Sequence, residues 1–376
     1  IPLATFAMDK YADDPCTHFI PKNSSDVTLS DKETRLIAKM HKAITIIQLK
    51  LEGQLIEHHP EWGMGKRDIF RMVDFDRGTV TIDGSEYELL DKNFPTVCRK
   101  DPLSLTDAEN ELMSVLENSF MHSERLNSHI RFLYSKGSMY KTINGNLLFH
   151  GCIPLDENGQ LQSVNIAGTD YSGKALLDKL DEIANKAYFM QPGAEKDYAA
   201  DYMWYLWSGA RSPLYGKDKM AFFERYFLDD KKLHKENYNA YYPFSEQAEV
   251  CGWILEMFGL DPERGHIING HVPVKIKNGE KPVKATVMIP PHNPTPYYTC
   301  SPPANATLPP RPGTARRNAR KPDIRAFFRD KTPVEPLFLG TRITKCYILF
   351  CVARAAKRRG VRLPSPPAAL TPATYP

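Results

Sequence analysis

Residues 147–154, LLFHGCIP, and residues 266–273, HIINGHVP, are two short apolar runs that each carry a histidine next to a glycine. Each run has the length of a buried strand, and the glycine is typical of a loop that begins where a strand ends. A neutral imidazole at a strand end is a common way to present a metal ligand from a rigid support. The pattern makes His150 and His271 candidate metal ligands, with two ordinary turn histidines as an equally favoured alternative. Their spacing matches no zinc-finger pattern, so a self-contained structural zinc site is not expected.

Helical and strand patterns alternate through the first 285 residues. A capping-box pattern at Ser30 and Glu33 precedes a long amphipathic run, which predicts a helix that ends near His58. Asp83-Gly84, set between alternating residues, predicts a β-hairpin. Further helices are expected over residues 106–136, 173–189 and 245–258, and two segments, 197–206 and 220–228, are rich in aromatic residues.

The composition changes near residue 285. Residues 286–376 hold 17 of the 30 prolines and carry a net charge of +12, whereas the first 285 residues carry −8. A Pro- and Arg-rich sequence without hydrophobic periodicity cannot bury enough surface to offset the entropy of ordering it. We expect this tail to be disordered. We also expect that it arises from out-of-frame translation or from a misassembled join in the coding sequence. A genuine basic tail that binds nucleic acid or anionic surfaces is the less favoured alternative, through Arg316, Arg317, Arg320, Lys357, Arg358 and Arg359.

Membrane proteins and disulfide-rich secreted proteins are excluded by the sequence pattern. The longest apolar run, residues 346–353, is far shorter than the ~20 residues of a membrane span. The seven cysteines are scattered without Cys-x-x-Cys pairs, which indicates reduced thiols and a cytoplasmic protein. No signal-peptide pattern is present, and a first residue of Ile1 in place of Met suggests a fragment.

Five long segments of the chain resemble one enzyme family. They are similar to the class III fructose-1,6-bisphosphatases of Firmicutes and related bacteria. The five segments are PLATFAMDKYADDPCTHFIPKN, LIAKMHKAITIIQLKLEGQLI, SKGSMYKTINGNLLFHGCIPLDENG, DYMWYLWSGARSPLYGKDKMAFFERYF and GHIINGHVPVKIKNGEKPVKA. The resemblance covers roughly residues 1–285. It implies an α/β fold, namely part of the calcineurin-like αββα metallophosphoesterase sandwich with a large, mostly helical insertion. The expected organisation is the insertion with one hairpin over residues 1–140, the C-terminal half of the core with a helical excursion over 141–285, and the tail over 286–376.

The resemblance also implies a site with two Mn²⁺ ions. Among the metal-binding blocks of that superfamily, the lone histidine corresponds to His150 and the final Gly-His to Gly270-His271. The Asp-x-His, Gly-Asp-x-x-Asp-Arg and Gly-Asn-His-Asp/Glu blocks are expected upstream of the first residue, so no catalytic residue is assigned within the chain. Asp76-Arg77 is superficially similar to the second block but lacks the leading Gly-Asp, and a turn is expected there.

A sugar bisphosphate also needs cations for the phosphate that is not cleaved. Residues 208–219 form a loop of small residues that contains Arg211, Lys217 and Lys219, which we predict to bind substrate. A solvated loop between two helices is about equally favoured. Ser212 has no evident base partner, so a serine-nucleophile mechanism has little support.

The activity implied by the resemblance is hydrolysis of fructose 1,6-bisphosphate to fructose 6-phosphate and phosphate, in gluconeogenesis. Two metal ions would activate the attacking water. We expect this chain alone to be inactive, because two histidines do not complete a di-metal site. The alternative is a truncated, non-catalytic relic that binds a partner or a phosphosugar. The aromatic-rich segments are candidates for a homo-oligomer interface, while a membrane partner is not expected and nucleic acid is not favoured.

Overall fold

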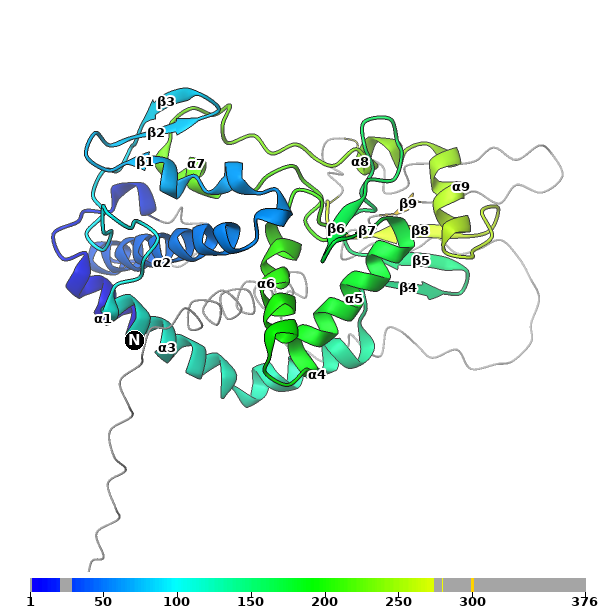
Figure 1. Cartoon of the computed structure of the whole chain (residues 1–376), viewed down its shortest axis with the longest axis horizontal. Coiled ribbons are helices and arrows are strands. Elements are labelled where there is room, and N and C mark those ends of the chain that lie inside the picture. The colour runs from blue at the N-terminus through cyan, green and yellow to red at the C-terminus, as the bar shows by residue number, and fades with distance from the viewer. Residues whose placement is uncertain (1, 21–28, 274–278, 280–298, 301–376) are drawn as a thin grey trace, which may run out of the picture.

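The computed structural model describes residues 2–20, 29–273, 279 and 299–300 of the 376-residue chain. In Figure 1 the long helix α2 and the β1–β3 strands lie at one end of the described part, and the β4–β5–β8 strands lie with α9 at the other. The helices are α1 (Pro2–Lys10), α2 (Asp31–His58), α3 (Asp107–Met121), α4 (Glu124–Lys136), α5 (Gly173–Phe189), α6 (Ala194–Ser208), α7 (Phe222–Phe227), α8 (Tyr241–Phe244) and α9 (Ala248–Met257). The strands are β1 (Val73–Asp74), β2 (Thr79–Ile82), β3 (Ser85–Glu88), β4 (Tyr140–Ile143), β5 (Asn146–Phe149), β6 (Val164–Ile166), β7 (Thr169–Tyr171), β8 (His266–Asn269) and β9 (Thr299–Cys300).

The predicted capping box starts α2. The Ser30 hydroxyl accepts a hydrogen bond from the Glu33 N–H at 3.3 Å, and the Glu33 carboxylate accepts one from the Ser30 N–H at 2.9 Å. These two bonds satisfy donors that the first turn of a helix leaves free. The helix ends at His58, as the sequence pattern predicts.

Two buried lysines on α2 join this helix to the segments around it. The Lys42 ammonium, fully buried, binds the carboxylates of Asp14 and Asp91. The Lys50 ammonium binds Glu109 at 2.7 Å, and both side chains are fully inaccessible to solvent. Because a buried charge is costly without a partner, these ion pairs fix which segments pack on α2.

The predicted hairpin is present as β2 and β3. Asp83 and Gly84 both have positive φ, 47° and 80°, which is the geometry of a two-residue type I′ turn. The segment before it, containing Asp76 and Arg77, is a turn, as expected, with both N–H groups donating to the Asp74 carboxylate at 3.0 Å.

The second sheet has the order β4-β5-β8-β9 and carries both candidate histidines at its edge. Strand β5 pairs antiparallel with β4 and parallel with β8, so that Phe149 lies opposite Asn269. Helix α5 contributes to two apolar clusters, since Leu180 packs with α2 and α6 residues while Leu177 packs with β5, β8 and α9 residues. The structure is thus a mixed α/β fold of helices and small sheets.

Two expectations differ from the structure or fall outside its described part. The helix predicted over 245–258 begins only at Ala248, because the Ser245 N–H donates to the Tyr241 carbonyl and closes α8 instead. The tail over 286–376 lies outside the described residues, apart from the two residues of β9, which pair parallel with β8. Within the described part of the chain, no helix is both long and apolar enough to cross a bilayer.

Candidate metal centre

The parallel pairing of β5 and β8 brings the two candidate histidines together. His150 directly follows β5, and His271 lies two residues beyond the end of β8. Because parallel neighbouring strands end at the same edge of a sheet, both side chains lie at that edge. His271 Nδ1 is 3.0 Å from His150 Nε2, and the two rings meet edge to face with centroids 5.0 Å apart.

Backbone and side-chain hydrogen bonds hold the two histidine loops against each other. The His150 carbonyl accepts from the N–H groups of Gly270 and His271, at 3.0 and 2.8 Å. The buried Asn269 amide donates to the Gly151 carbonyl at 2.9 Å. These three bonds link adjacent strand ends, so the separation of the imidazoles is set by the sheet and not by flexible side chains alone.

The two glycines of this edge have different roles. A Cβ on Gly151 would lie against the carbonyl oxygen of Pro213, and it would be 3.1 Å from that of Leu214. Gly151 therefore allows residues 209–216 to pack closely against the end of β5, where the Pro213 carbonyl also accepts the Cys152 N–H at 2.9 Å. A Cβ on Gly270 would meet no atom of the described residues within 4 Å, so this glycine is not required by close packing there.

Both imidazoles are held in the neutral form that binds metals. The protein around His150 partly shields its ring from water and so lowers its pKa, although the residue keeps an exposed surface. Burial, together with His150 and Lys217, lowers the pKa of His271 to about 4, against the opposing effect of a hydrogen bond with the Tyr215 backbone. A neutral histidine that contacts a backbone group with one side of its ring and presents the other nitrogen is the usual form of a metal ligand.

The separation of the two nitrogens fits one shared ion. Two nitrogens about 2.1 Å from the same metal are roughly 3.0–3.4 Å apart for the usual coordination angles, close to the 3.0 Å observed here. The same distance is that of a hydrogen bond between two neutral imidazoles, which joins the two rings in this structure. Two ligands do not complete a site, however. Among the described residues, this pair is not part of any group of three or more close His, Cys, Asp or Glu ligands.

The three predicted phosphate-binding cations have different partners. Arg211 is exposed and donates to the Ser163 carbonyl at 3.2 Å. Lys217 binds Glu236 at 2.7 Å and lies close enough to His271 to lower its pKa. Lys219 donates instead to the backbone carbonyl of residue 233 at 3.0 Å.

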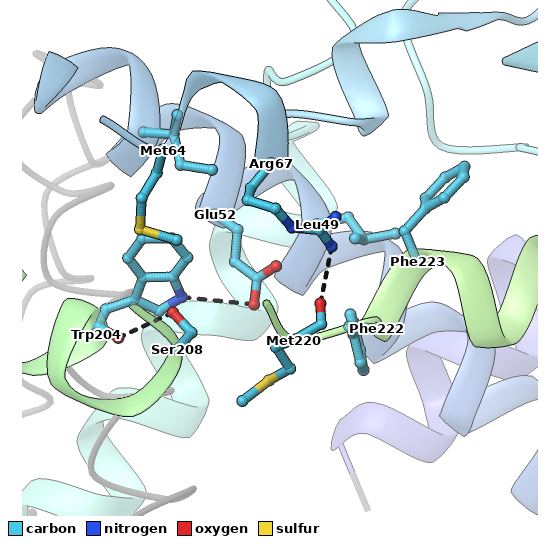
Figure 2. A pocket seen from close by; sticks show the side chains of 10 residues that line it. Leu49, Glu52, Met64, Arg67, Trp204, Ser208, Met220, Phe222 and Phe223 are labelled. Carbon is cyan, nitrogen blue, oxygen red and sulfur yellow. Dashed lines mark hydrogen bonds between the residues drawn. The ribbon is translucent and has the colours of Figure 1, made fainter. Parts of the chain in front are cut away.

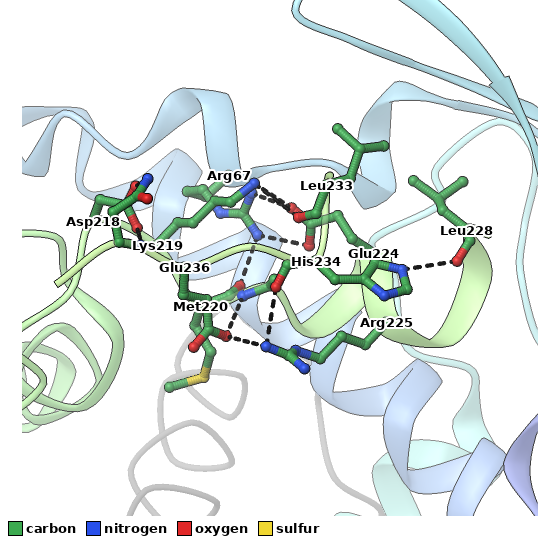
Figure 3. A network of polar contacts seen from close by, with 12 residues as sticks. Arg67, Asp218, Lys219, Met220, Glu224, Arg225, Leu228, Leu233, His234 and Glu236 are labelled. Atoms are coloured by element: carbon green, nitrogen blue, oxygen red, sulfur yellow. Dashed lines mark hydrogen bonds and ion pairs between the residues drawn. The ribbon is translucent and has the colours of Figure 1, made fainter. Parts of the chain in front are cut away.

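Figure 3 shows the network of polar contacts beside Asp218 and Lys219, at the end of the 208–219 loop. Arg67 binds both oxygens of the buried Glu224, at 2.7 and 3.1 Å, and also donates to the Met220 carbonyl at 2.8 Å. Glu236 accepts from Lys217 and, at 3.0 Å, from the backbone N–H of residue 221. This geometry favours a bracing role for Lys219, which lies 3.7 Å from Glu224.

Ser212 contributes to the fold of the same loop. Its buried hydroxyl donates to the Leu206 carbonyl and accepts from the N–H groups of Leu214 and Tyr215, at 3.2 and 3.4 Å. Because this hydroxyl donates its proton to a backbone carbonyl, it does not donate to a general base among the described residues.

A separate pocket lies between α2, α6 and α7 (Figure 2). Apolar and aromatic side chains line it together with Glu52 and Arg67, and its free volume of about 30 Å³ suits one or two water molecules. Glu52 accepts hydrogen bonds from Gln48 at 2.7 Å and from the Trp204 indole at 3.5 Å. Burial raises the pKa of this carboxyl to about 7. No sequence pattern singles out Glu52, because its environment arises only when α2 and α6 pack together.

Comparison with known proteins identifies the family of this chain. The sequence model of the Firmicute fructose-1,6-bisphosphatases matches residues 1–289, and the chain belongs to that family. The resemblance read from the sequence is thereby confirmed.

Several curated relatives share about half of their matched residues with the chain. The protein named fructose-1,6-bisphosphatase class 3 is 52% identical over 286 residues in Clostridium acetobutylicum and 53% identical over 287 residues in Bacteroides fragilis. Each match covers 76% of this chain but only 43% of the relative. The chain therefore spans less than half the length of these relatives. No solved structure matches it.

Proposed function

We propose that this chain is the part of a class 3 fructose-1,6-bisphosphatase that supplies two histidine ligands of a two-metal site. The observation that carries the proposal is the 3.0 Å approach of His150 and His271 at one sheet edge, in a chain of that family. The whole protein would hydrolyse fructose 1,6-bisphosphate to fructose 6-phosphate and phosphate, as a gluconeogenic enzyme of the cytoplasm.

The bound Mn²⁺ ions would supply Lewis-acid activation of water for in-line attack on phosphorus. His150 and His271 would each offer a neutral nitrogen to the metal, from positions fixed by the sheet. More than half of each relative's length lies outside the matched region. We propose that the part of the whole protein that corresponds to this unmatched length supplies the remaining metal ligands and the rest of a calcineurin-like sandwich. Within the chain, residues 1–140 would be a helical insertion and residues 141–285 the C-terminal half of the core.

For the substrate we propose Lys217 and Arg211 as phosphate contacts, and a supporting role for Lys219. Lys217 adds positive charge beside His271, and Glu236 fixes its position. Arg211 uses one hydrogen bond to a backbone carbonyl, which leaves other guanidinium donors for phosphate oxygens. The aromatic-rich segments remain our candidates for a homo-oligomer interface.

A non-catalytic binding protein is the second candidate, favoured by the presence of only two metal ligands at this edge in the described part of the chain. The two candidates differ in a phosphate-release assay with Mn²⁺. We expect no release from the chain alone. Residues 1–289, exchanged into the matched region of the C. acetobutylicum relative, are expected to give a chimera that hydrolyses fructose 1,6-bisphosphate.

Single substitutions in this chimera test the histidine pair. His150→Asn and His271→Asn are each expected to lower hydrolysis by at least about 100-fold, because each removes a metal ligand outright. His122→Asn, at an exposed histidine that follows α3, is the matched control and should leave hydrolysis unchanged. A chimera that stays active with both His150 and His271 replaced would refute the proposal, and a folded but inactive chimera would favour the binding protein.

A further inference from the structure

A second group of potential metal ligands lies where the C-terminal end of α2 meets α6 (Figure 1). His58 is the last residue of α2, His59 follows it, and Asp201 lies on α6. One ligand atom from each of the three residues lies within 4.8 Å of the other two. We propose that His58, His59 and Asp201 bind a Zn²⁺ ion at a site distinct from that of the proposed function.

The pair of His59 and Asp201 already has the spacing of two ligands on one ion. His59 Nε2 is 3.1 Å from Asp201 Oδ2, within the roughly 3.0–3.4 Å expected for two donors about 2.1 Å from the same metal. Asp201 is 94% buried, and its other oxygen, Oδ1, has no hydrogen-bond partner in the described part of the chain. A buried carboxylate oxygen left in this state is costly, and a cation bound by the carboxylate would offset part of the cost.

The surroundings of His59 orient its Nε2 toward Asp201. On the other side of the ring, Nδ1 is 2.8 Å from the Glu61 carboxylate, and the ring stacks on Trp62 with centroids 4.0 Å apart. A carboxylate that accepts the Nδ1–H and leaves the Nε2 lone pair for a metal is the usual support of a zinc-binding histidine. In this tautomer a lone pair would face a carboxylate oxygen, and a metal ion between them would be bound by both.

His58 supplies the third donor and the entry path. Its side chain is exposed, and its ring meets that of His59 edge to face with centroids 4.8 Å apart. Because an exposed side chain changes rotamer easily, its nitrogen can close the remaining distance to a shared ion. Two imidazoles and one carboxylate are a donor set that suits Zn²⁺, with water in the fourth position.

The competing account is that a proton, not a metal, lies between His59 and Asp201. Burial alone would lower the pKa of His59, but its hydrogen bonds to Asp201 and Glu61 outweigh that effect and raise it. In that case the group is an imidazolium held between two carboxylates, and His58 takes no part in it. The role of His58 therefore separates the two accounts.

Zinc binding by the full chain decides between them. In a background that carries His150→Asn and His271→Asn, competition with a chromogenic chelator is expected to show one equivalent of bound Zn²⁺. Co²⁺ in place of Zn²⁺ is expected to give visible absorption bands of a low-symmetry nitrogen and oxygen site. Adding His58→Asn should weaken Zn²⁺ binding at least about tenfold and alter these bands, with the far-UV circular dichroism unchanged.

His122→Asn in the same background is the matched control, because it removes another exposed histidine at a helix end. Asp201→Asn is a second variant and should abolish the Co²⁺ bands. Absence of a bound equivalent in the background protein would overturn the proposal, as would equal Zn²⁺ affinity in the His58→Asn and His122→Asn variants. Neither result touches the proposed function, which the hydrolysis assay of the chimera tests separately.

Discussion

Replacing Glu52 by glutamine should make the chain more stable at high pH. Glu52 lies in the small pocket between α2, α6 and α7, where burial raises its pKa to about 7 from an ordinary 4.5 (Figure 2). Gln48 and the Trp204 indole donate to its carboxyl group. The amide of Glu52→Gln keeps an oxygen that can accept from these two donors, and it never ionises.

The sign and size of the effect follow from proton linkage. Between pH 4.5 and about 7 the folded chain holds a proton on Glu52 that the unfolded chain has lost, so the free energy of unfolding falls as pH rises. The two pKa values differ by about 2.5, and each pKa unit is worth about 1.4 kcal/mol. At pH 8 the carboxylate therefore destabilises the folded state by up to about 3 kcal/mol relative to pH 4.5. Glu52→Gln removes this loss.

Urea denaturation at a series of pH values, followed by circular dichroism, measures the effect. The difference in unfolding free energy between Glu52→Gln and the parent chain should grow from near zero at pH 4.5 to about 3 kcal/mol at pH 8. All other titrating groups are common to both proteins and cancel in this difference. Glu57→Gln, at an exposed position of the same helix, is the control and should change stability by less than about 0.5 kcal/mol. A difference that stays constant across the pH range would show that Glu52 does not titrate with a raised pKa in the folded chain.

Four other substitutions test the packing of the core and of the histidine edge. Glu109→Gln keeps an oxygen for the cap of α3 but leaves the buried Lys50 ammonium without its counter-charge, and urea denaturation should show a loss of about 3–5 kcal/mol. Gly151→Ala should cost about 1–3 kcal/mol in the same assay, because its Cβ would overlap a facing carbonyl, whereas Gly270→Ala has open space and should cost less than about 0.5 kcal/mol. Equal losses in the two glycine variants would contradict the close packing. Asn269→Ala removes the one side-chain bond among the three hydrogen bonds that link the two histidine loops. Calorimetry of the chimera should show Mn²⁺ affinity reduced about tenfold.

Local sequence signals predicted much of the fold. The capping box at Ser30 and Glu33 and the Asp83-Gly84 turn act over a few residues, and both appear in the structure as predicted. The β4–β5 hairpin was missed, although Asn144-Gly145 between its strands is an equally strong local signal, with φ of 54° and 77°. The apolar run of β5 indicates a strand by itself, whereas β4 is mostly exposed and lacks a buried hydrophobic pattern.

The histidine edge shows where sequence reasoning ends. That His150 and His271 follow short apolar runs is visible in the sequence, but their 3.0 Å approach depends on parallel pairing of strands about 120 residues apart. The partners of Lys217 and Lys219 are set by tertiary contacts with residues 224 and 236, which no local pattern reveals. The same dependence on distant segments holds for His59, which in the sequence is an ordinary histidine at the end of a predicted helix. It becomes a candidate ligand only because α6 carries a buried carboxylate to within 3.1 Å of it.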